Sequence, residues 1–297
     1  MSTFAKGTFD FARYAAARPT YPRQLYDFVF KYHERSRGAK WDLAVDLGCG
    51  TGQATVELTA FKRVIGVDPS NGMIEKAKAY AAQVDVGKTA QVEFVHSSAE
   101  ELPFLEDGSV DLLVAAQAAH WFNWDKVWPE VARVLRKDGS AAFWGYSEFR
   151  LSNYPKLTPL ITQYSQGSDP EKSLGPHWQQ PGRSIVDNHF LDVPKATDVL
   201  PDKFSEWEHV FFTGEHHPDL KDARPTILRK KMKWEDLHAY LHSFSSLHTY
   251  LEKYPQDKEN PEGDIATRFF KTLQKETGEP EYIDVEWPMA VMLVKRK

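Results

Sequence analysis

The residues best suited to chemistry are two aspartates and the glycines between them. Residues 46–52 read Asp46-Leu47-Gly48-Cys49-Gly50-Thr51-Gly52, and a second acid, Asp68, follows sixteen residues after Gly52. Glycine lets a backbone turn sharply and approach a ligand closely. An acid at about this distance from such a loop can accept hydrogen bonds from the two hydroxyls of a ribose. The pattern therefore predicts a nucleoside-binding site.

Three short elements must position these groups. Residues 43–47 form an apolar run that is typical of a strand buried on both faces. A helix is expected over residues 53–61, and a second buried strand over 64–67 would end on Asp68. This strand-helix-strand unit would bring the glycine loop and Asp68 to the same edge of a sheet.

The glycine spacing indicates which nucleoside is bound. Dinucleotide folds use G-x-G-x-x-G, whereas here the glycines alternate and Asp46 precedes the first by two residues. An acid there would repel a pyrophosphate but could attract an ammonium group, which disfavours a nicotinamide oxidoreductase. The pattern resembles the class I S-adenosylmethionine (SAM)-dependent methyltransferases; the alternative is an apolar strand with a glycine-rich turn. The resemblance implies SAM as cofactor, held by Asp46, Gly48, Cys49, Gly50, Gly52, Asp68 and Pro69.

The same resemblance implies further cofactor contacts. Met73 lies in a helix that is expected to start at Ser70. The pair Ser98-Ala99 follows a third expected strand over 92–95, and the pair Gln117-Ala118 follows a fourth over 110–116. Members of the family place such residues near the adenosine, although a plain loop is the alternative for the first pair. The residues so implied are Met73, Ser98, Ala99, Gln117 and Ala118.

Aromatic residues and a histidine follow the ends of two expected strands. His120 and Trp121 come just after the strand over 110–116, and Trp144 and Tyr146 close a fifth strand over 141–144. Ligands bind at the carboxyl ends of strands in open α/β sheets. We therefore expect these four residues to contact substrate, with His120 as a catalytic hydrogen-bond donor; core packing is the alternative for Trp144.

The segment before the first strand combines tyrosines with arginine and proline. Pro19 and Pro22 interrupt the helical period, which predicts a helix-loop-helix lead-in. The segment resembles one that folds over the SAM site in a branch of class I methyltransferases. The resemblance implies that Tyr14 and Arg18 reach the methionine carboxylate or an acidic substrate, and that Tyr21 lines the substrate site. A surface arginine beside core tyrosines is the alternative.

The α/β alternation lapses over residues 150–201, which are rich in proline. Long irregular connections are more often functional than idle, so we expect a cap that supplies Trp178 and Arg183 to the substrate. Beyond it we expect a strand over 208–213, a basic segment over 227–232 that leads into a helix over 234–250, a helix over 265–275 and a final strand over 283–294.

The motifs together resemble the fungal trans-aconitate 3-methyltransferases along nearly the whole chain. They are Arg13-Tyr14, Arg18-Pro19, Tyr21-Pro22, residues 119–122, residues 144–146 and residues 174–184. The resemblance implies an α/β Rossmann-like class I methyltransferase fold. It has a seven-stranded mainly parallel sheet with helices on both faces, an antiparallel last strand and an inserted cap. It divides the chain into a helical lead-in (1–40), a SAM-binding core (41–150), a cap (151–205) and a completion of the sheet (206–297).

The implied reaction makes a methyl ester of a small carboxylic acid such as trans-aconitate. A carboxylate is already ionised at neutral pH and needs no general base. Arginine binds carboxylates bidentately, which favours Arg18 and Arg183 as anchors. Alternatives are methylation of a phenol, an amine or a long-chain unsaturated acid, and a non-catalytic SAM-binding protein.

Composition favours a small-molecule partner. A net charge of -5 with a pI near 6.1 gives no reason to expect nucleic acid or an anionic membrane. Cys49 is the only cysteine, so no intrachain disulfide can form, and we expect it to pack rather than act as a nucleophile. No apolar signal core, membrane span or metal-ligand spacing is evident, and we expect a cytoplasmic monomer or homodimer without metal.

Overall fold

The structure is a computed structural model that describes residues 18–84 and 90–297. The described chain divides into two compact units. Unit 1 contains residues 18–19, Ser147–Ser184 and Leu228–Pro288; unit 2 contains Thr20–Tyr146, Ile185–Ile227 and Met289–Lys297. Tyr14 lies outside the described residues, so its predicted role stays a prediction, as does the functional division into lead-in, core and cap.

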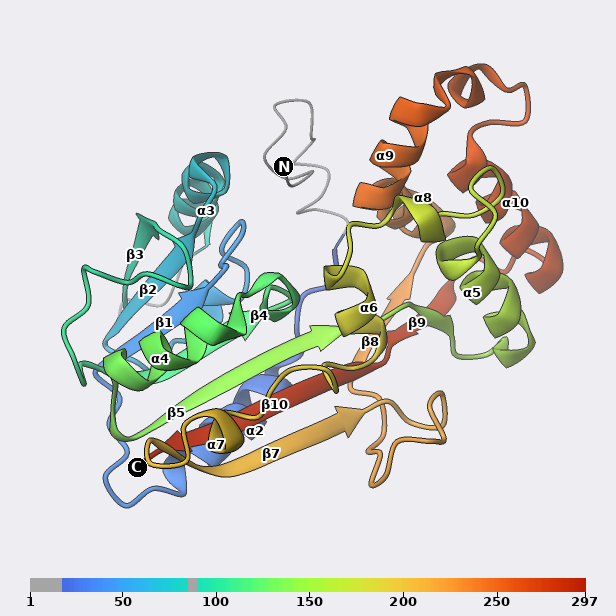
Figure 1. Ribbon diagram of the computed structural model, residues 1–297. Coiled ribbons are helices and arrows are strands. Elements are labelled where there is room, and N and C mark those ends of the chain that lie inside the picture. Colours follow the sequence, from blue (N-terminus) through green and yellow to red (C-terminus); the bar gives the residue numbers. More distant parts are fainter. Residues whose placement is uncertain (1–17, 85–89) are drawn as a thin grey trace. The chain divides into compact units, whose positions relative to one another are not determined.

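Unit 2 is built on a seven-stranded sheet with the order β3-β2-β1-β4-β5-β10-β7. The first five strands are parallel, and β10, red in Figure 1, lies antiparallel between β5 and β7. This confirms the predicted Rossmann-like fold with its antiparallel last strand. The strands are β1 (Leu43–Leu47), β2 (Arg63–Asp68), β3 (Gln91–His96), β4 (Val110–Ala116), β5 (Leu135–Tyr146), β7 (Phe204–Phe212) and β10 (Met289–Arg296).

Helices cover both faces of this sheet. The ring of Phe143 in β5 lies 5.6 Å from that of Trp128 in α4, and the ring of Trp144 lies 6.0 Å from that of Tyr26 in α2. Since neighbouring residues of a strand point to opposite faces, α2 and α4 lie on opposite sides. The helical elements of unit 2 are α2 (Arg23–Glu34), η2 (Thr55–Glu57), α3 (Asn71–Gln83), η3 (Ala119–Trp121), α4 (Trp124–Val134) and α7 (Ala196–Val199).

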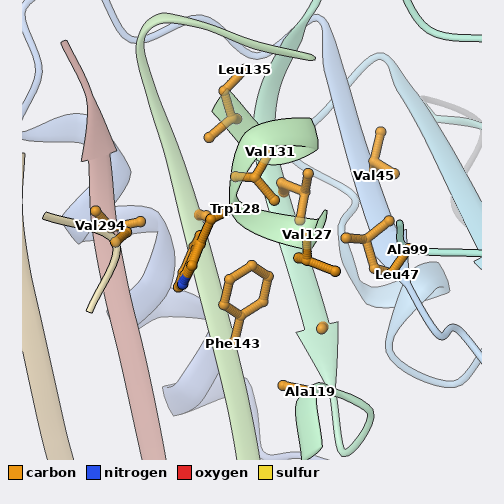
Figure 2. Close-up of a cluster of buried hydrophobic side chains, with 14 of the residues drawn as sticks. Val45, Leu47, Ala99, Ala119, Val127, Trp128, Val131, Leu135, Phe143 and Val294 are labelled. Carbon is orange, nitrogen blue, oxygen red and sulfur yellow. The ribbon is translucent and has the colours of Figure 1, made fainter. Parts of the chain in front are cut away.

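The core on the α4 side forms because apolar residues recur at helical spacing. Trp124, Val127, Trp128 and Val131 of α4 are all buried. Figure 2 shows Val127, Trp128 and Val131 facing the sheet beside Phe143. The indole nitrogen of Trp128 donates to the Pro194 carbonyl at 2.8 Å, so this large ring is buried without an unsatisfied polar group.

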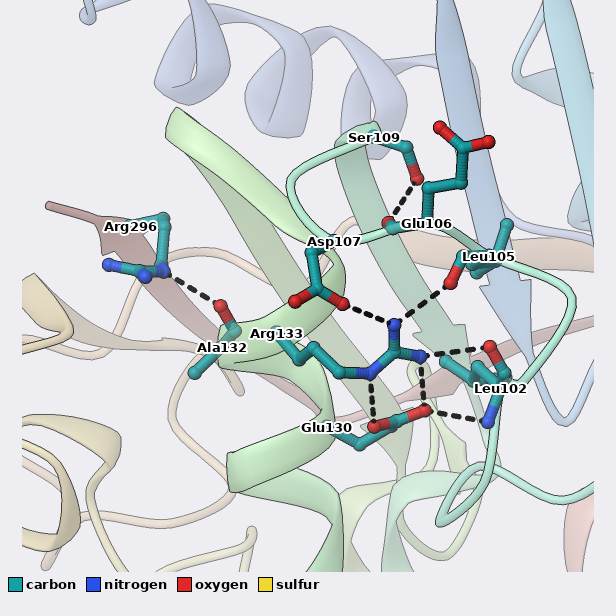
Figure 3. Close-up of polar contacts among 9 residues, drawn as sticks. All are labelled: Leu102, Leu105, Glu106, Asp107, Ser109, Glu130, Ala132, Arg133 and Arg296. Atoms are coloured by element: carbon teal, nitrogen blue, oxygen red, sulfur yellow. Dashed lines mark hydrogen bonds and ion pairs between the residues drawn. The ribbon is translucent and has the colours of Figure 1, made fainter.

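Arg133 ties the long connection between β3 and β4 to helix α4. Its guanidinium forms ion pairs with Glu130 (2.7 Å) and Asp107 (2.8 Å) and donates to the carbonyls of Leu102 and Leu105 at 2.9 Å each (Figure 3). Glu130 in turn accepts from the Leu102 amide at 2.7 Å. These bonds fix the connection that carries Ser98 and Ala99.

Unit 1 contains a second, three-stranded antiparallel sheet of order β6-β9-β8, which the sequence pattern did not predict. Helix α6 (Gly182–Asp187) begins in unit 1 and ends in unit 2. The elements of unit 1 are β6 (Arg150–Leu151), η4 (Pro155–Leu157), α5 (Thr158–Gln166), η5 (Gly175–His177), β8 (Leu228–Met232), α8 (Trp234–His242), α9 (Ser245–Lys253), η6 (Pro255–Glu259), α10 (Ile265–Thr277) and β9 (Ile283–Trp287).

The single strand predicted over 283–294 is wrong. It splits at Pro288 into β9, which belongs to the sheet of unit 1, and β10, which belongs to the sheet of unit 2. Proline has no backbone N–H to donate to a ladder, which suits a break between two sheets. The basic segment before α8 is itself a strand, β8, which pairs with β9 in antiparallel orientation.

Two predicted helices are also wrong in extent. Only Thr55–Glu57 is helical within residues 53–61, and it is a 3₁₀ turn. The helix over 234–250 breaks into α8 and α9 at Ser243, whose hydroxyl donates to the Tyr240 carbonyl at 2.6 Å, and Phe244 has an extended backbone. Such side-chain bonds to the backbone compete with helix continuation.

Strand β5 begins at Leu135, earlier than the predicted start at 141. Its register explains the difference: Val110 pairs with Leu135, but Leu112 pairs with Ser140, so the residues between Leu135 and Ser140 form a bulge within the strand. Asp138 has a positive φ of 67° in this bulge.

Among the described residues, no helix combines the length and the apolar composition that crossing a bilayer requires. Within the same residues, no group of three or more His, Cys, Asp or Glu side chains is placed to hold a metal ion.

Candidate functional site

The glycine loop follows β1 directly and lies at the carboxyl end of the sheet in unit 2. Gly48 has a φ of 69°, and a Cβ there would lie 2.4 Å from the Cβ of Ala118. Gly50 has a φ of 55°, and a Cβ there would meet nothing within 4 Å. The first glycine is therefore required by close packing, whereas the second leaves open space beside a bare backbone. Such a space suits a ligand.

Asp68 closes this loop onto the end of β2. One carboxylate oxygen accepts from the Gly50 amide at 3.0 Å, and the other accepts from the Ser70 amide at 2.8 Å. Burial raises the pKa of Asp68, and these two hydrogen bonds oppose the rise. Each oxygen retains a lone pair that can accept from a ligand hydroxyl. The sequence pattern predicts that Asp68 accepts hydrogen bonds from the hydroxyls of a ribose, and the geometry is compatible with that role.

Asp46 is the most deeply buried acid of the loop region, with no exposed surface. Its Oδ2 accepts from the Thr55 hydroxyl at 2.6 Å, while Oδ1 has no hydrogen-bond partner in the described chain. Burial raises the pKa of Asp46 to about 7, the Thr55 bond lowers it, and the nearby charge of Asp68 raises it. A cation would satisfy this carboxylate, because an opposite charge favours the ionised form.

Cys49 lies between these acids and is 7% exposed. Burial and the charges of Asp46 and Asp68 raise the pKa of its thiol well above the usual value. The thiol is the inert form of cysteine, so this environment favours packing over nucleophilic attack.

The other predicted cofactor contacts follow β2, β3 and β4. Met73 is buried in the first turn of α3, where its amide donates to the Ser70 hydroxyl at 3.4 Å. Ala99 is buried in the core cluster and Ser98 is half-buried beside it. Ala118 packs against Gly48. Pro69 accepts a hydrogen bond from His96 through its carbonyl at 2.9 Å.

Gln117 uses its side chain to join the ends of β4 and β5. Its Nε2 donates to the Tyr146 carbonyl at 3.0 Å, and its Oε1 accepts from the Tyr146 amide at 2.7 Å. Its own backbone has a φ of 54°, and its amide donates to the Trp144 carbonyl at 2.8 Å. The side-chain amide therefore holds the backbone on which two predicted substrate contacts lie.

The aromatic residues predicted for the substrate differ in exposure. Trp121 is 40% exposed on η3, and its ring lies 4.6 Å from that of His120. Trp144 is fully buried, with Tyr21 at 5.7 Å, and its Nε1 has no hydrogen-bond partner among the described residues. Tyr146 is buried 6.3 Å from Tyr21. Trp144 therefore packs in the core, where its ring contacts those of Tyr21 and Tyr26.

The predicted arginines lie in unit 1, each against aromatic rings. The Cζ atom of Arg18 lies 5.3 Å from the Tyr240 ring centroid and 5.4 Å from that of Phe244. The Cζ atom of Arg183 lies 4.2 Å from the Trp178 ring centroid. These are cation–π distances. The Trp178 ring lies 5.3 Å from that of Phe244, so both arginines belong to one group of ring contacts that includes Tyr240 of α8.

Sequence reasoning missed Thr55, Tyr240 and Phe244. Thr55 is nine residues from its partner Asp46 and lay within a segment expected to be a regular helix. Tyr240 and Phe244 occur in an apolar helical pattern that reads as ordinary core. None of these carries a local signal, because each acquires its neighbours only through the fold.

Comparison with known proteins finds similar sequences along most of the chain. Residues 45–143 match the methyltransferase domain family. A protein of Dictyostelium discoideum that is named as a methyltransferase is 31% identical over 286 residues, covering 96% of this chain and 92% of that protein. A protein of Saccharomyces cerevisiae that is named as an S-adenosylmethionine-dependent methyltransferase is 30% identical, covering 71% of this chain and 69% of that protein.

The structure is similar to a solved structure of a protein from Anaeromyxobacter dehalogenans that is described as a putative type II methyltransferase. The two superpose with a TM-score of 0.65 at 24% identity, covering 93% of this chain and 97% of that chain. At this identity the likeness shows the fold alone.

Proposed function

The chain belongs to the class I SAM-dependent methyltransferases, and we propose that it forms methyl esters of small carboxylic acids, with di- and tricarboxylates such as trans-aconitate favoured. SAM is its cofactor. The acid as substrate goes beyond what family membership shows.

The residues of the glycine loop fit SAM. The open space beside Gly50 admits a ligand, Asp68 has lone pairs for a ribose, and Asp46 offers a buried oxygen without a partner among the described residues. SAM carries an ammonium and a sulfonium, so a buried carboxylate suits its positive charge. When bound, SAM supplies a methyl group activated by the sulfonium.

The observation that carries the acid proposal is that Arg18 and Arg183 both lie on aromatic rings of the same unit. Guanidinium groups match carboxylates in geometry and stay charged at any physiological pH. Aromatic walls keep water away from such a pair, which strengthens its electrostatic attraction. A di- or tricarboxylate would bind the guanidinium groups through its carboxylates and contact the aromatic rings through its carbon chain.

For such an acid the protein has little chemistry to perform beyond placement. A carboxylate oxygen is ionised near neutral pH and can attack without a general base. Correct placement of reacting groups supplies about 7–11 kcal/mol of barrier reduction. We propose that Arg18 and Arg183 orient the acid, that His120 donates a further hydrogen bond, and that the aromatic residues exclude water. Because an anion and a cation neutralise each other during transfer, a dry site favours the transition state.

We further propose that the protein works in the cytoplasm, as a monomer or homodimer, on a small molecule and not on nucleic acid. The acidic balance of the chain, with a net charge of -5, supports a small-molecule partner over nucleic acid.

The test is methyl transfer from labelled SAM to a panel that contains trans-aconitate, fumarate, itaconate, a long-chain unsaturated acid, a phenol and an amine. Base-labile methyl esters on a small acid, identified by mass, are the expected product. Esters on the fatty acid alone, or transfer only to the phenol or amine, would replace the proposal by the corresponding alternative. Bound SAM without any transfer would favour a non-catalytic role.

A variant of Arg183 tests whether this arginine binds the acid. Arg183→Ala should raise the KM for the di- or tricarboxylate while SAM affinity stays nearly unchanged, because a charged hydrogen-bonding partner is lost only for the acid. Arg229→Ala is the matched control in the same unit, since Arg229 pairs with Glu286 and is 60% exposed. An unaltered KM in the Arg183 variant would remove this residue from the proposal.

A further inference from the structure

Unit 1 contains two arginines set on three aromatic rings. We call Arg18, Trp178, Arg183, Tyr240 and Phe244 the arginine–aromatic cluster. Phe244 joins its two halves, because its ring centroid lies 5.3 Å from that of Trp178 and 5.0 Å from that of Tyr240. The residues come from three segments that lie far apart in the sequence, yet all belong to one compact unit.

Hydrogen bonds hold the members of the cluster in place. A guanidinium nitrogen of Arg18 donates to the Ser243 carbonyl at 3.1 Å, at the break between α8 and α9. The indole nitrogen of Trp178 donates to the Ser165 carbonyl at 2.8 Å. Because the helix is interrupted here, the Ser243 carbonyl can accept the hydrogen bond from Arg18.

The Tyr240 hydroxyl is the unusual group of the cluster. Tyr240 is 2% exposed, and its hydroxyl accepts a hydrogen bond from the Trp287 indole nitrogen at 2.9 Å. Within residues 18–84 and 90–297, no group accepts the hydroxyl proton in return. Buried hydroxyls usually both accept and donate. The missing acceptor is a position that a ligand oxygen could take.

The charges around this hydroxyl indicate the sign of that ligand. Burial raises the pKa of Tyr240, whereas the positive charges of Arg18 and Arg183 lower it and the charge of Glu148 raises it. Both arginines therefore act electrostatically on one hydroxyl. Glu148 is itself held by the Arg150 guanidinium at 3.0 Å and by the Thr162 hydroxyl at 3.1 Å. A hydroxyl donor that experiences the positive charge of two guanidinium groups suits an anion.

Resting on the proposed function, we infer that the arginine–aromatic cluster binds a carboxylate of the acid other than the one that is esterified, with the Tyr240 hydroxyl as its hydrogen-bond donor. Guanidinium groups and a hydroxyl provide directed donors to the carboxylate, and the rings of Trp178 and Phe244 provide flat apolar walls for an unsaturated carbon chain. A monocarboxylate offers no second carboxylate to the cluster. Tyr240 would thus be a specificity-determining residue that selects polycarboxylates.

The test measures acid binding without methyl transfer. The full chain is saturated with S-adenosylhomocysteine, and trans-aconitate, fumarate and crotonate, which carry three, two and one carboxylates, are titrated by calorimetry. The expected order of affinity follows the number of carboxylates. Crotonate shares the unsaturated four-carbon chain of fumarate, so equal affinity for crotonate and the polycarboxylates would overturn the inference.

Tyr240→Phe removes the hydroxyl and should weaken binding of the polycarboxylates by about tenfold, with crotonate affinity unchanged. Trp287→Phe is the matched control, because it breaks the same Trp287–Tyr240 hydrogen bond but keeps the hydroxyl. Equal losses in the two variants, or no loss in either, would overturn the role of Tyr240. Arg18→Gln tests the cluster if Tyr240→Phe does not fold, and unchanged polycarboxylate affinity in that variant would also contradict the inference.

Failure of this inference and failure of the proposed function are distinguishable. Polycarboxylate binding that depends on Tyr240, without any ester product, would support the carboxylate-binding role of the cluster and overturn the proposed function. Ester formation with an unaltered KM in Tyr240→Phe would do the reverse.

Discussion

The hydroxyl of Thr55 donates a 2.6 Å hydrogen bond to Oδ2 of Asp46, an acid with no exposed surface at the start of the glycine loop. Hydrogen bonding to a carboxylate favours its ionised form, whereas burial disfavours it. The balance leaves the pKa of Asp46 at about 7. A residue of a short 3₁₀ turn therefore influences the charge of the acid that we propose to face the cofactor.

Replacing Thr55 by valine should weaken SAM binding at neutral pH. Loss of the hydroxyl raises the pKa of Asp46 further, so less of the carboxylate is ionised, and we expect an affinity loss of about three- to tenfold at pH 7.5. Calorimetric titration at pH 7.5 and pH 9 is the measurement, and the defect should shrink at the higher pH. Thr249→Val, in helix α9, is the control for the same change elsewhere. An affinity that equals the wild type at pH 7.5 would contradict this role of Thr55.

Asp46→Asn should change how the stability of the unliganded protein depends on pH. A carboxyl whose folded pKa of about 7 lies above its unfolded value of 3.8 stabilises the fold at low pH. That contribution is lost as the pH rises through 7. The wild type should therefore lose stability between pH 5 and pH 8 relative to the variant, as measured by urea unfolding. Parallel stability curves would show that Asp46 has no such raised pKa.

Gln117→Leu should destabilise unit 2 by about 1–3 kcal/mol, because it removes both side-chain hydrogen bonds to the Tyr146 backbone. Denaturant unfolding measures the loss. Gln117→Glu provides a graded comparison, since a carboxylate can accept from the Tyr146 amide but cannot donate to its carbonyl. We expect the glutamate variant to lie between wild type and leucine if the two bonds act as described. A leucine variant as stable as the wild type would argue that water replaces both bonds.

Lys295 is a buried cation at the other end of the sheet and should impose its own pH dependence. It is 2% exposed and donates to the His33 carbonyl at 2.8 Å and to the Ser140 hydroxyl at 3.0 Å. Burial lowers the pKa of Lys295 to about 8 from 10.5. Between these values the unfolded chain binds more protons than the folded one, so stability rises with pH.

Lys295→Met removes this titrating group. Between pH 7.5 and pH 9.5 the wild type should gain stability relative to the variant, which thermal or denaturant unfolding at matched ionic strength can measure. A constant difference between the two proteins over this range would contradict the lowered pKa.

The local pattern of the chain was enough to predict the fold class and to place the glycine loop at the end of its first strand. The alternating glycines and the strand that ends on Asp68 lie close together in the sequence, so the bonds that join them close a short loop. Buried parallel strands read as apolar runs whatever their neighbours are. The Rossmann-like sheet could therefore be predicted before any contact was known.

Tertiary structure alone decided which groups meet. Thr55 reaches Asp46 only because the expected helix is a 3₁₀ turn, and Gln117 is committed to the Tyr146 backbone because β4 and β5 end side by side. Arg18 and Tyr240 come from distant parts of the chain, and their contact depends on the packing of unit 1. A sequence pattern reports periodicity within one element, whereas the partner of a buried polar group is chosen by which elements pack together.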